Sequence, residues 1–586
     1  MTQPVGNFDP PIMALASRYP ELLHDLQAWA RANPASTQLR GIRQKPLELG
    51  HGGNEVLFNH LQPEGVLPRL SGREGGVLHV FSEVAGFLHF LTQPAAIECI
   101  VHPNWAPLLL LPLEHAPHMQ QWLLQAQPRR WPWALLNASV FPDVAVGRAA
   151  QAVGQQMVAL LEQLTANLAS RIARRYMDRP TPAAVVRQGQ RPLRVLVWAY
   201  EGSMYQQFCA RDISDALGAR GVEVRAVISV AGPAKDYELA EAVESFDPDV
   251  LLLNGRGRDH TQSLPGQLCI LTWDQDHCLC HSTYHAQKLG GRDLLMVMVD
   301  DWRRDAVAAG FPRSRTAHVN LGTNHRLYRE PAVPQPAEYD VLFVGNIHPF
   351  ETYRRLINFD EFDELTQSLL LRARQRLGEW LGSRGEEEAF VIPDSEQLLR
   401  ECSAELGLSV TADERHWRFL VNYFRYRIAH LLVREVFVSS LTEFRLGLFG
   451  RGWEHFPAVA AHARPEIENG PPLREAIHRA AINLHLHTWT VHHPRLYDTA
   501  AAGGFLLVGR VPEAYPLQRV FTPGEELDTF GCIAELKRKI RHYLANPEER
   551  VAMAGRAADR ARREHTMEHR AADMLRFLAK DVYDDQ

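Results

Sequence analysis

The hydrophobic pattern between positions 190 and 300 alternates short apolar runs with longer amphipathic stretches. The apolar runs are LRVLVWAY, VEVRAVISV, DVLLLNG, QLCILTWD and DLLMVMVD. Each run is almost continuously hydrophobic and rich in Val, Leu and Ile, as expected of strands that helices cover on both faces. We therefore predict an α/β domain with a doubly wound parallel sheet over residues 186–325. Its ligand crevice should lie beyond the carboxyl ends of the strands.

A second series of the same kind follows in residues 326–586. It begins at YDVLFVGN and continues with FRLGLFGRGW, AAINLHLH and GFLLVG. Between the first and second of these runs, the spacing of apolar residues is helical over about residues 356–441. We predict a second Rossmann-like domain that carries this stretch as a helical insertion.

The pattern of residues 1–185 is less regular. The segments GVLHVFS, AAIECIVH and APLLLLPL read as strands with helical pieces between them, and residues 144–177 have the spacing of one long helix. The Pro-punctuated segment DRPTPAAVVRQGQRP that follows reads as a linker. We predict an accessory domain, α/β or mainly helical, whose role would be recognition of an acceptor or a partner.

Length and charge limit the classes of function. A chain of 586 residues is too long for one hydrophobic core, and its net charge of −6 lacks the basic excess of nucleic-acid binders. Seven Cys at irregular spacings form no disulfide framework, which favours a reducing compartment such as the cytoplasm. The longest dense apolar run, WAPLLLLPLEH, falls far short of the roughly 20 residues of a membrane span.

Several blocks of the chain carry a family resemblance. The blocks are YDVLFVGNIHPFETYRRLI, FRLGLFGRGWEHF, AAINLHLHTWTVHHPRLYDTAAAGGFLLVG and LKRKIRHYLANPEERVAMAGRAADRARREHTMEHRAADML. In order and spacing they resemble the C-terminal half of the CgeB-like family of GT-B glycosyltransferases. LTWDQDH, MVMVDDWRRDAVAAGF and NLGTNHRLY resemble its N-terminal half, so the resemblance covers roughly residues 190–586.

The resemblance implies GT-B architecture, in which two Rossmann-like domains face a cleft. It implies transfer of a sugar, of the hexosyl type, from a nucleotide-sugar donor held by the C-terminal domain. The acceptor, which the N-terminal domain would hold, stays open between a protein, a glycan and a lipid-linked glycan. No cofactor is expected, since the donor is a co-substrate. The resemblance also implies no metal, because GT-B enzymes generally neutralise the leaving diphosphate with basic side chains and helix ends. Two alternatives remain: a nucleotide-sugar epimerase, and a non-catalytic binding or scaffold protein on the same fold.

Two strand ends offer donor-binding residues. Gly345 and Asn346 follow the strand DVLFV, where a backbone without Cβ lets a diphosphate or sugar approach closely. After FRLGLF, Arg451 offers a bidentate fork for phosphate, and Trp453 offers a stacking or a packing surface. His487 and its alternate neighbour His485 would face one side of their strand, for packing or for donor contact.

The block HHPRLYDTAAAGG is the strongest donor-binding candidate. If Pro494 begins a helix, Arg495 and Asp498 share a face, and the helix N-terminus would favour phosphate oxygens. Asp498 stands where the family usually has a Glu that, by resemblance, hydrogen-bonds the donor ribose. A structural salt bridge between Arg495 and Asp498 is the alternative. Gly503 and Gly504 would end the helix and allow a close turn.

Catalysis by inversion would need a carboxylate or His that deprotonates the acceptor hydroxyl. Glu201, and Asp276 with His277, follow predicted strands at the crevice edge and are the candidates. If the enzyme retains configuration, the donor's own phosphate can assist instead.

The segment HCLCHSTYH also raises the possibility of a metal site. Its possible ligands are His277, Cys278, Cys280, His281 and His285. The two Cys are separated by one residue, whereas zinc sites use pairs spaced by two to four with a second pair downstream. We therefore predict no structural metal, although a stripe of His on a helix remains an alternative.

Overall fold

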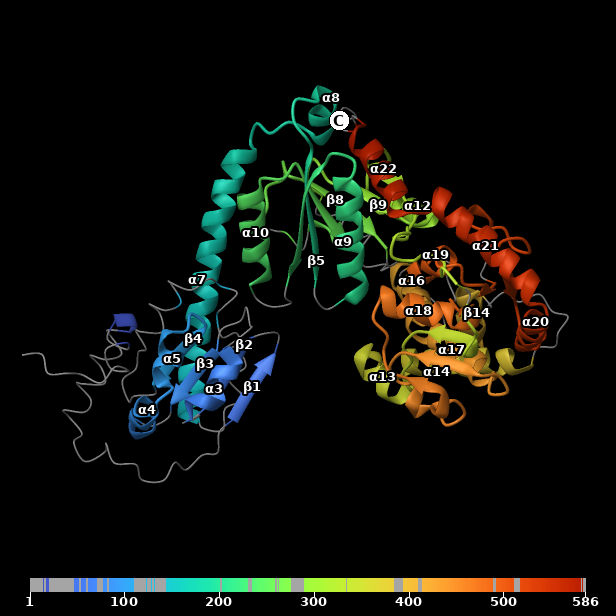
Figure 1. Ribbon diagram of the computed structural model, residues 1–586, viewed down its shortest axis with the longest axis horizontal. Helices are drawn as coiled ribbons and strands as arrows, with labels where there is room; N and C mark the ends of the chain where they lie inside the picture. Colours follow the sequence, from blue (N-terminus) through green and yellow to red (C-terminus); the bar gives the residue numbers. More distant parts are fainter. Residues whose placement is uncertain are drawn as a thin grey trace, which may run out of the picture.

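The computed structural model places two parallel six-stranded sheets and a smaller four-stranded sheet along the chain (Figure 1). The residues described are 14, 17–19, 47–51, 54–58, 62–70, 77–81, 84–109, 123, 128, 131, 144–200, 203–229, 234–258, 261, 263–275, 289–333, 335–383, 394–408, 414–487, 492–510, 517–580 and 582. Among the described helices, none combines the length and the apolarity that crossing a bilayer requires.

The N-terminal sheet has the order β1-β2-β3-β4, with β1 antiparallel to β2 and the other pairs parallel. Its strands are Leu47–His51, Asn54–Phe58, Val77–Phe81 and Trp105–Leu109. Its helices are α3 (Pro63–Leu70), α4 (Val84–Leu91) and α5 (Ala96–Val101). Of the two alternatives for this region, the structure therefore has the α/β one.

The second sheet is fully parallel, with the order β10-β9-β8-β7-β5-β6. Its strands are β5 (Arg194–Tyr200), β6 (Glu223–Ser229), β7 (Val250–Asn254), β8 (Cys269–Asp274), β9 (Leu294–Val297) and β10 (Thr316–His318). The helices between them are α9 (Met204–Gly218), α10 (Lys235–Phe246) and α12 (Asp300–Ala308). Every residue of β7, β8 and β9 is buried, which explains the unbroken apolar runs in the sequence.

The third sheet is also parallel, with the order β13-β12-β11-β14-β15-β16. Its strands are β11 (Tyr339–Val344), β12 (Leu446–Phe449), β13 (Ala463–Arg464), β14 (Ala480–His485), β15 (Leu506–Gly509) and β16 (Asp528–Phe530). Its helices are α18 (Pro471–His478), α19 (Pro494–Ala501), α20 (Ile533–Ala545), α21 (Pro547–Glu564) and α22 (Met567–Leu578). The two sheets with their flanking helices confirm the predicted α/β fold class.

A helical insertion separates β11 from β12. It contains α13 (Phe350–Leu356), α14 (Glu364–Ser383), α15 (Ser395–Glu405), α16 (Glu414–Tyr423), the π-helical turn η8 (Phe424–Ala429) and α17 (His430–Ser439). Short 3-10 turns elsewhere are η6 (Arg313–Arg315), η7 (Phe359–Glu361), η9 (Trp453–His455), η10 (Ala460–His462) and η11 (Leu517–Arg519). The insertion packs on the third sheet through one apolar core that includes Leu370, Leu399 and Phe437.

Helix α7 (Val144–Tyr176) runs from the N-terminal sheet to the second sheet, where its last turns lie beside α10 (Figure 1). Leu168, Ile172 and Tyr176 are buried there against Trp198 and Val243. This helix is followed by α8 (Pro182–Gln188), which Thr181 caps by accepting a hydrogen bond from the Ala184 amide at 3.2 Å.

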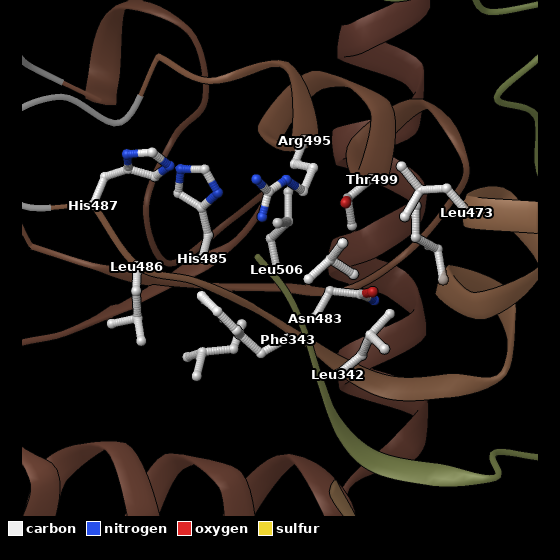
Figure 2. A pocket seen from close by; sticks show the side chains of 13 residues that line it. Leu342, Phe343, Leu473, Asn483, His485, Leu486, His487, Arg495, Thr499 and Leu506 are labelled. Carbon is white, nitrogen blue, oxygen red and sulfur yellow. The ribbon is translucent and has the colours of Figure 1, made fainter. Parts of the chain in front are cut away.

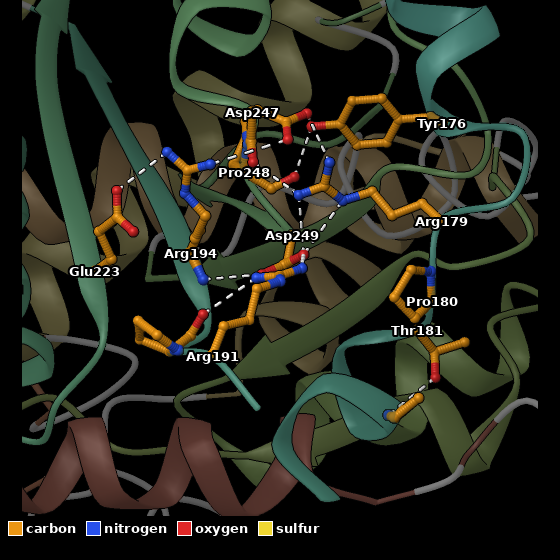
Figure 3. A network of polar contacts seen from close by, with 12 residues as sticks. Tyr176, Arg179, Pro180, Thr181, Arg191, Arg194, Glu223, Asp247, Pro248 and Asp249 are labelled. Carbon is orange, nitrogen blue, oxygen red and sulfur yellow. Dashed lines mark hydrogen bonds and ion pairs between the residues drawn. The ribbon is translucent and has the colours of Figure 1, made fainter. Parts of the chain in front are cut away.

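A polar network fixes the segment after α7 to the start of β7 (Figure 3). The buried Asp249 carboxylate accepts hydrogen bonds from Arg191 at 2.7 Å, from Arg179 at 3.0 Å and from the Arg194 amide at 2.9 Å. Arg179 also bonds Asp247 at 2.6 Å. Burial by itself would raise the pKa of Asp249, but the hydrogen bonds from Arg191 and from the Arg194 amide outweigh it and hold the pKa below its ordinary value.

The chain returns from the third sheet to the second at its C-terminal end. Helix α22 packs against α8 and α9, and Thr566 at its start forms a β-bridge with Thr323. Next to Thr323, the Asn324 side-chain amide donates to Asp212 of α9 at 2.7 Å. The two Rossmann-like units therefore meet at the segment around residues 323–324 and at α22.

Candidate active-site cleft

A cleft of about 830 Å³ lies between the second and third sheets. Ser203, Gln275 and Met298 line it from the second sheet, and they follow the carboxyl ends of β5, β8 and β9. Most of the remaining lining comes from the insertion and from the segment around α19. The cleft therefore has the position that the sequence pattern predicted for a ligand crevice.

The strand order of the third sheet makes β11 and β14 the neighbours from which the chain winds in opposite directions. Ligands of doubly wound sheets bind at such a switch point. Gly345 follows β11, and His487 follows β14. A Cβ on Gly345 would lie 3.3 Å from Nη1 of Arg495. The absence of a side chain at Gly345 therefore leaves space for the Arg495 guanidinium.

The turns after β11 and β12 interlock. Asn346 Oδ1 accepts a hydrogen bond from the Arg451 amide at 2.9 Å, and Trp453 Nε1 donates to the Gly345 carbonyl at 2.8 Å. Gly452 has a φ of +96°, and a Cβ there would lie 1.8 Å from the Ile347 carbonyl oxygen. This pairing fixes the backbone of the β11 turn beneath the cleft.

Among the donor-binding candidates, Arg451 and Trp453 lie outside the cleft lining, as do Gly345 and Asn346. Trp453 has 0% exposed surface and packs edge-on against Phe343, so it provides packing, and no stacking surface is available to a ligand. Arg451 extends into solvent with 68% of its side chain exposed and pairs with Glu466 at 3.4 Å. The phosphate role suggested for Arg451 therefore has no support from its position in this structure.

Helix α19 begins at the cleft. Pro494 occupies its first turn, and His493 caps it by accepting a hydrogen bond from the Arg495 amide at 3.3 Å. His493, Pro494 and Arg495 all line the cleft, so the partial positive charge of the helix N-terminus faces the cavity. Pro494 has no amide hydrogen, and the Arg495 and Leu496 amides donate to the side chain and the carbonyl of His493, so the helix presents its dipole to the cavity.

Arg495 and Asp498 lie on this helix without pairing. Within the described residues, no carboxylate oxygen lies within 4.0 Å of the Arg495 guanidinium, so the salt bridge considered as an alternative is not formed. Asp498 Oδ1 accepts a hydrogen bond from the Thr323 hydroxyl at 2.6 Å instead. Burial raises the pKa of Asp498 to about 8, and Asp212 adds to that increase, so the carboxyl is mostly protonated at neutral pH.

Gly503 and Gly504 close α19 on the side away from the cleft. Gly503 has a φ of +74°, and a Cβ there would lie 2.6 Å from Glu330 Cγ. A Cβ on Gly504 would lie 2.5 Å from Ile477 Cγ2. These glycines permit the turn into β15, as the sequence suggested, and they position the helix without lining the cleft.

Arg434 is a cleft residue that the sequence reasoning missed. It comes from α17 in the insertion, and its Nη1 donates to the Asn346 carbonyl at 3.1 Å. Its Nε is buried with no hydrogen-bond partner among the described residues. Burial lowers the pKa of Arg434 to about 10 and that of Arg495 to about 9, with Arg434 adding to the decrease at Arg495. The signal was a pair of charged residues, Arg434 and Glu435, within the largely apolar run LLVREVFV.

The charge balance of the cleft is positive. Arg427, Arg434 and Arg495 line it, and none has an ion-pair partner among the described residues. Among the described residues that line the cleft, Asp498 is the one acidic residue. Because its pKa is raised to about 8, it carries little negative charge at neutral pH. Two buried guanidinium groups without a carboxylate partner among the described residues therefore line one cavity, and burial of such charges is unfavourable unless an anion joins them.

Three imidazoles surround Arg495. The ring centroid of His487 lies 4.9 Å from that of His485 and 4.6 Å from that of His493. Figure 2 shows His485, His487 and Arg495 on one side of β14 and Leu486 on the other. Burial lowers the pKa of His487 and of His493 well below the ordinary value, so both rings are neutral. They can therefore donate or accept hydrogen bonds beside an anion without adding charge.

Glu201, Asp276 and His277 lie outside the described residues, as do Cys278, Cys280, His281 and His285. The predictions of a catalytic base and of no structural metal in that segment therefore stay predictions. Ser203 and Gln275, the described residues nearest to these candidates in the chain, both line the cleft. Within the described part of the chain, no group of three or more His, Cys, Asp or Glu side chains could hold a metal ion.

Comparisons with known proteins address the C-terminal half most directly. Residues 427–576 match a family model described as glycosyl transferase-like. A search among curated proteins finds no match. Among solved structures, the chain is similar to a glycosyltransferase from Rickettsia africae ESF-5, with 9% identity, 67% of this chain and 100% of that chain covered, and a TM-score of 0.37.

Two further similar structures are HepE from Anabaena in complex with UDP and glucose, and a sucrose-phosphate synthase from Thermosynechococcus elongatus. The first has 10% identity, coverage of 66% of this chain and 100% of that chain, and a TM-score of 0.36. The second has 13% identity, coverage of 65% and 97%, and a TM-score of 0.35. All three TM-scores are low, so we assign the architecture from the strand order of this chain and not from these similarities. Residues 427–576, which contribute Arg434 and Arg495 to the cleft, are the part of the chain that is similar to the glycosyl transferase-like family.

Proposed function

We propose that this protein is a glycosyltransferase that takes a sugar from a nucleotide-activated donor and binds the donor diphosphate in the cleft. The observation that carries the proposal is the pair Arg434 and Arg495. Both guanidinium groups lie deep in the cleft, without a carboxylate partner among the described residues, beside the N-terminus of α19. Burying two like charges is unfavourable unless an anion joins them.

The same groups would support the chemistry of transfer. When the bond between the sugar and the diphosphate breaks, negative charge develops on the leaving phosphate. Fixed cations and amide groups stabilise that charge most strongly where water is excluded. We expect Arg434, Arg495 and the positive end of the α19 dipole to provide this stabilisation without a metal ion.

Asp498 would serve the donor in its protonated form. Its Oδ1 is occupied by the Thr323 hydroxyl, so its other oxygen would carry any bond to the donor. A protonated carboxyl can donate a hydrogen bond to a hydroxyl or a phosphate oxygen, which a carboxylate cannot do. In the family that the chain resembles, a Glu at this position hydrogen-bonds the donor ribose. A hydrogen bond donated by protonated Asp498 would take the place of that contact, although the side chain is shorter.

The proposal is tested by thermal shift with UDP, GDP, ADP, dTDP and CDP. At least one nucleotide should raise the unfolding temperature of the wild type, since binding to the folded state stabilises it. Arg495→Ala should abolish the shift. Arg451→Ala is the matched control, because that arginine is exposed and outside the cleft lining, and it should keep the shift. The absence of any shift across the panel would disprove the proposal.

A further inference from the structure

One continuous helical run of the insertion lines the cleft from its mouth to the diphosphate site. The run joins α16, η8 and α17 without a break from Glu414 to Ser439. Its cleft-lining residues, called the insertion stripe below, are Phe419, Asn422, Tyr423, Tyr426, Arg427, His430 and Arg434. Phe419 and Arg434 are 15 positions apart, which corresponds to about 22 Å along a helix. The stripe therefore extends well beyond one sugar and its diphosphate.

The outer end of the stripe is aromatic and accessible. Phe419 has 38% of its surface exposed, and its ring lies 6.0 Å from that of Tyr423. Tyr423 packs edge-on against Phe362 at 4.9 Å, and its hydroxyl donates to the Ile357 carbonyl at 2.8 Å. These contacts hold the rings in place before any ligand arrives, so little ordering would be needed on binding.

Polar groups interrupt the aromatic surface. Asn422, Arg427 and Asn358 line the same part of the cleft. Asn422 Nδ2 donates to the Arg418 carbonyl at 2.8 Å, which fixes the amide and leaves its oxygen available as an acceptor. The π-helical turn η8 lies at the centre of the stripe, and such turns inside α-helices occur frequently at functional sites.

The combination of aromatic rings and polar groups along the insertion stripe favours a carbohydrate ligand. A sugar ring presents an apolar C–H face, which an aromatic ring can cover, and a rim of hydroxyl groups, which amide and guanidinium groups can bind. A lipid chain would need an unbroken apolar wall, because burial of Asn422, Asn358 and Arg427 against it would leave their polar groups unsatisfied.

We propose that the outer part of the insertion stripe, formed by Phe419, Tyr423, Tyr426 and Asn422, binds an oligosaccharide acceptor. The proposal rests on the proposed function, and it assigns acceptor contacts to the insertion of the C-terminal domain. A glycan bound there runs along the helix toward Arg434, so its end lies near the donor site.

The test uses a glycan array that carries hexose, N-acetylhexosamine and uronic acid oligomers of one to eight sugars. Wild-type protein should bind oligomers of at least one class more tightly than the monosaccharide. Phe419→Ala should weaken that binding about tenfold, as expected for the loss of one aromatic contact. The matched control is Leu365→Ala, since Leu365 is 62% exposed on α14 and does not line the cleft; it should bind as the wild type does.

Three results would overturn the proposal: no oligomer binds, Phe419→Ala and Leu365→Ala bind equally well, or Phe419→Ala loses nucleotide affinity instead of glycan affinity. Binding to phosphatidylglycerol vesicles that Phe419→Ala abolishes would also overturn it, in favour of a membrane surface. The nucleotide thermal shift, measured on the same samples, tests the proposed function separately. Arg434→Gln should lose that shift and still bind the oligomers.

Discussion

Replacing Arg434 by methionine should stabilise the unliganded protein and weaken its binding of a nucleoside diphosphate. Burial lowers the pKa of Arg434 to about 10, and a decrease of this size corresponds to roughly 3 kcal/mol of unfavourable charge burial. Methionine keeps the apolar stem and removes the charge, but it loses the hydrogen bond to Asn346, which contributes roughly 1 kcal/mol. The net gain is about 2 kcal/mol.

Binding should change in the opposite direction. A guanidinium bonded to phosphate contributes roughly 2–3 kcal/mol, so Arg434→Met should weaken nucleotide affinity about a hundredfold. Scanning calorimetry without nucleotide and titration calorimetry with the best nucleotide measure the two effects on one preparation. A variant with a lower unfolding temperature and unchanged affinity would show that Arg434 is structural, and it would refute this reasoning.

Two further predictions follow from the cleft. The pKa of Asp498, raised to about 8 in the folded state, lies above its ordinary value near 4. Its stabilising contribution is therefore complete below about pH 4 and is lost as the pH rises through 8. Asp498→Asn should become steadily more stable relative to wild type between pH 5 and 8, and parallel unfolding temperatures over this range would contradict the assignment. Gly345→Ala should lower nucleotide affinity about tenfold in titration calorimetry, because the added methyl group lies 3.3 Å from the Arg495 guanidinium. Gly378→Ala, whose methyl group would meet only Leu432 at 3.9 Å, is its control and should bind normally.

The parallel sheets could be predicted because strands covered on both faces must be apolar throughout. β7, β8 and β9 show this directly, since all their residues are buried. Pro494 likewise indicated the start of α19, because proline is tolerated in the first turn of a helix but disrupts the interior of a helix. These are local rules, so they can be read without knowing the tertiary structure.

The cleft chemistry was harder to predict because it depends on distant partners. Arg434 reaches Asn346 across 88 positions, with most of the insertion between them. The spacing of Arg495 and Asp498 left a salt bridge as an alternative to donor binding, but Thr323, 175 positions from Asp498, donates a hydrogen bond to that carboxyl group instead. Trp453 could have stacked or packed, and its complete burial against Phe343 decides in favour of packing.

The central claim is that the cleft cleaves a nucleotide sugar with Arg434 and Arg495 on its diphosphate. The most direct measurement is release of nucleoside diphosphate and free sugar from a panel of nucleotide sugars without acceptor, followed by mass spectrometry. The wild type should slowly hydrolyse at least one donor, and Arg434→Met and Arg495→Ala should each lose this activity while Arg451→Ala keeps it. Hydrolysis of no donor, equal hydrolysis by all four proteins, or conversion of the donor to an epimer without release would contradict the claim.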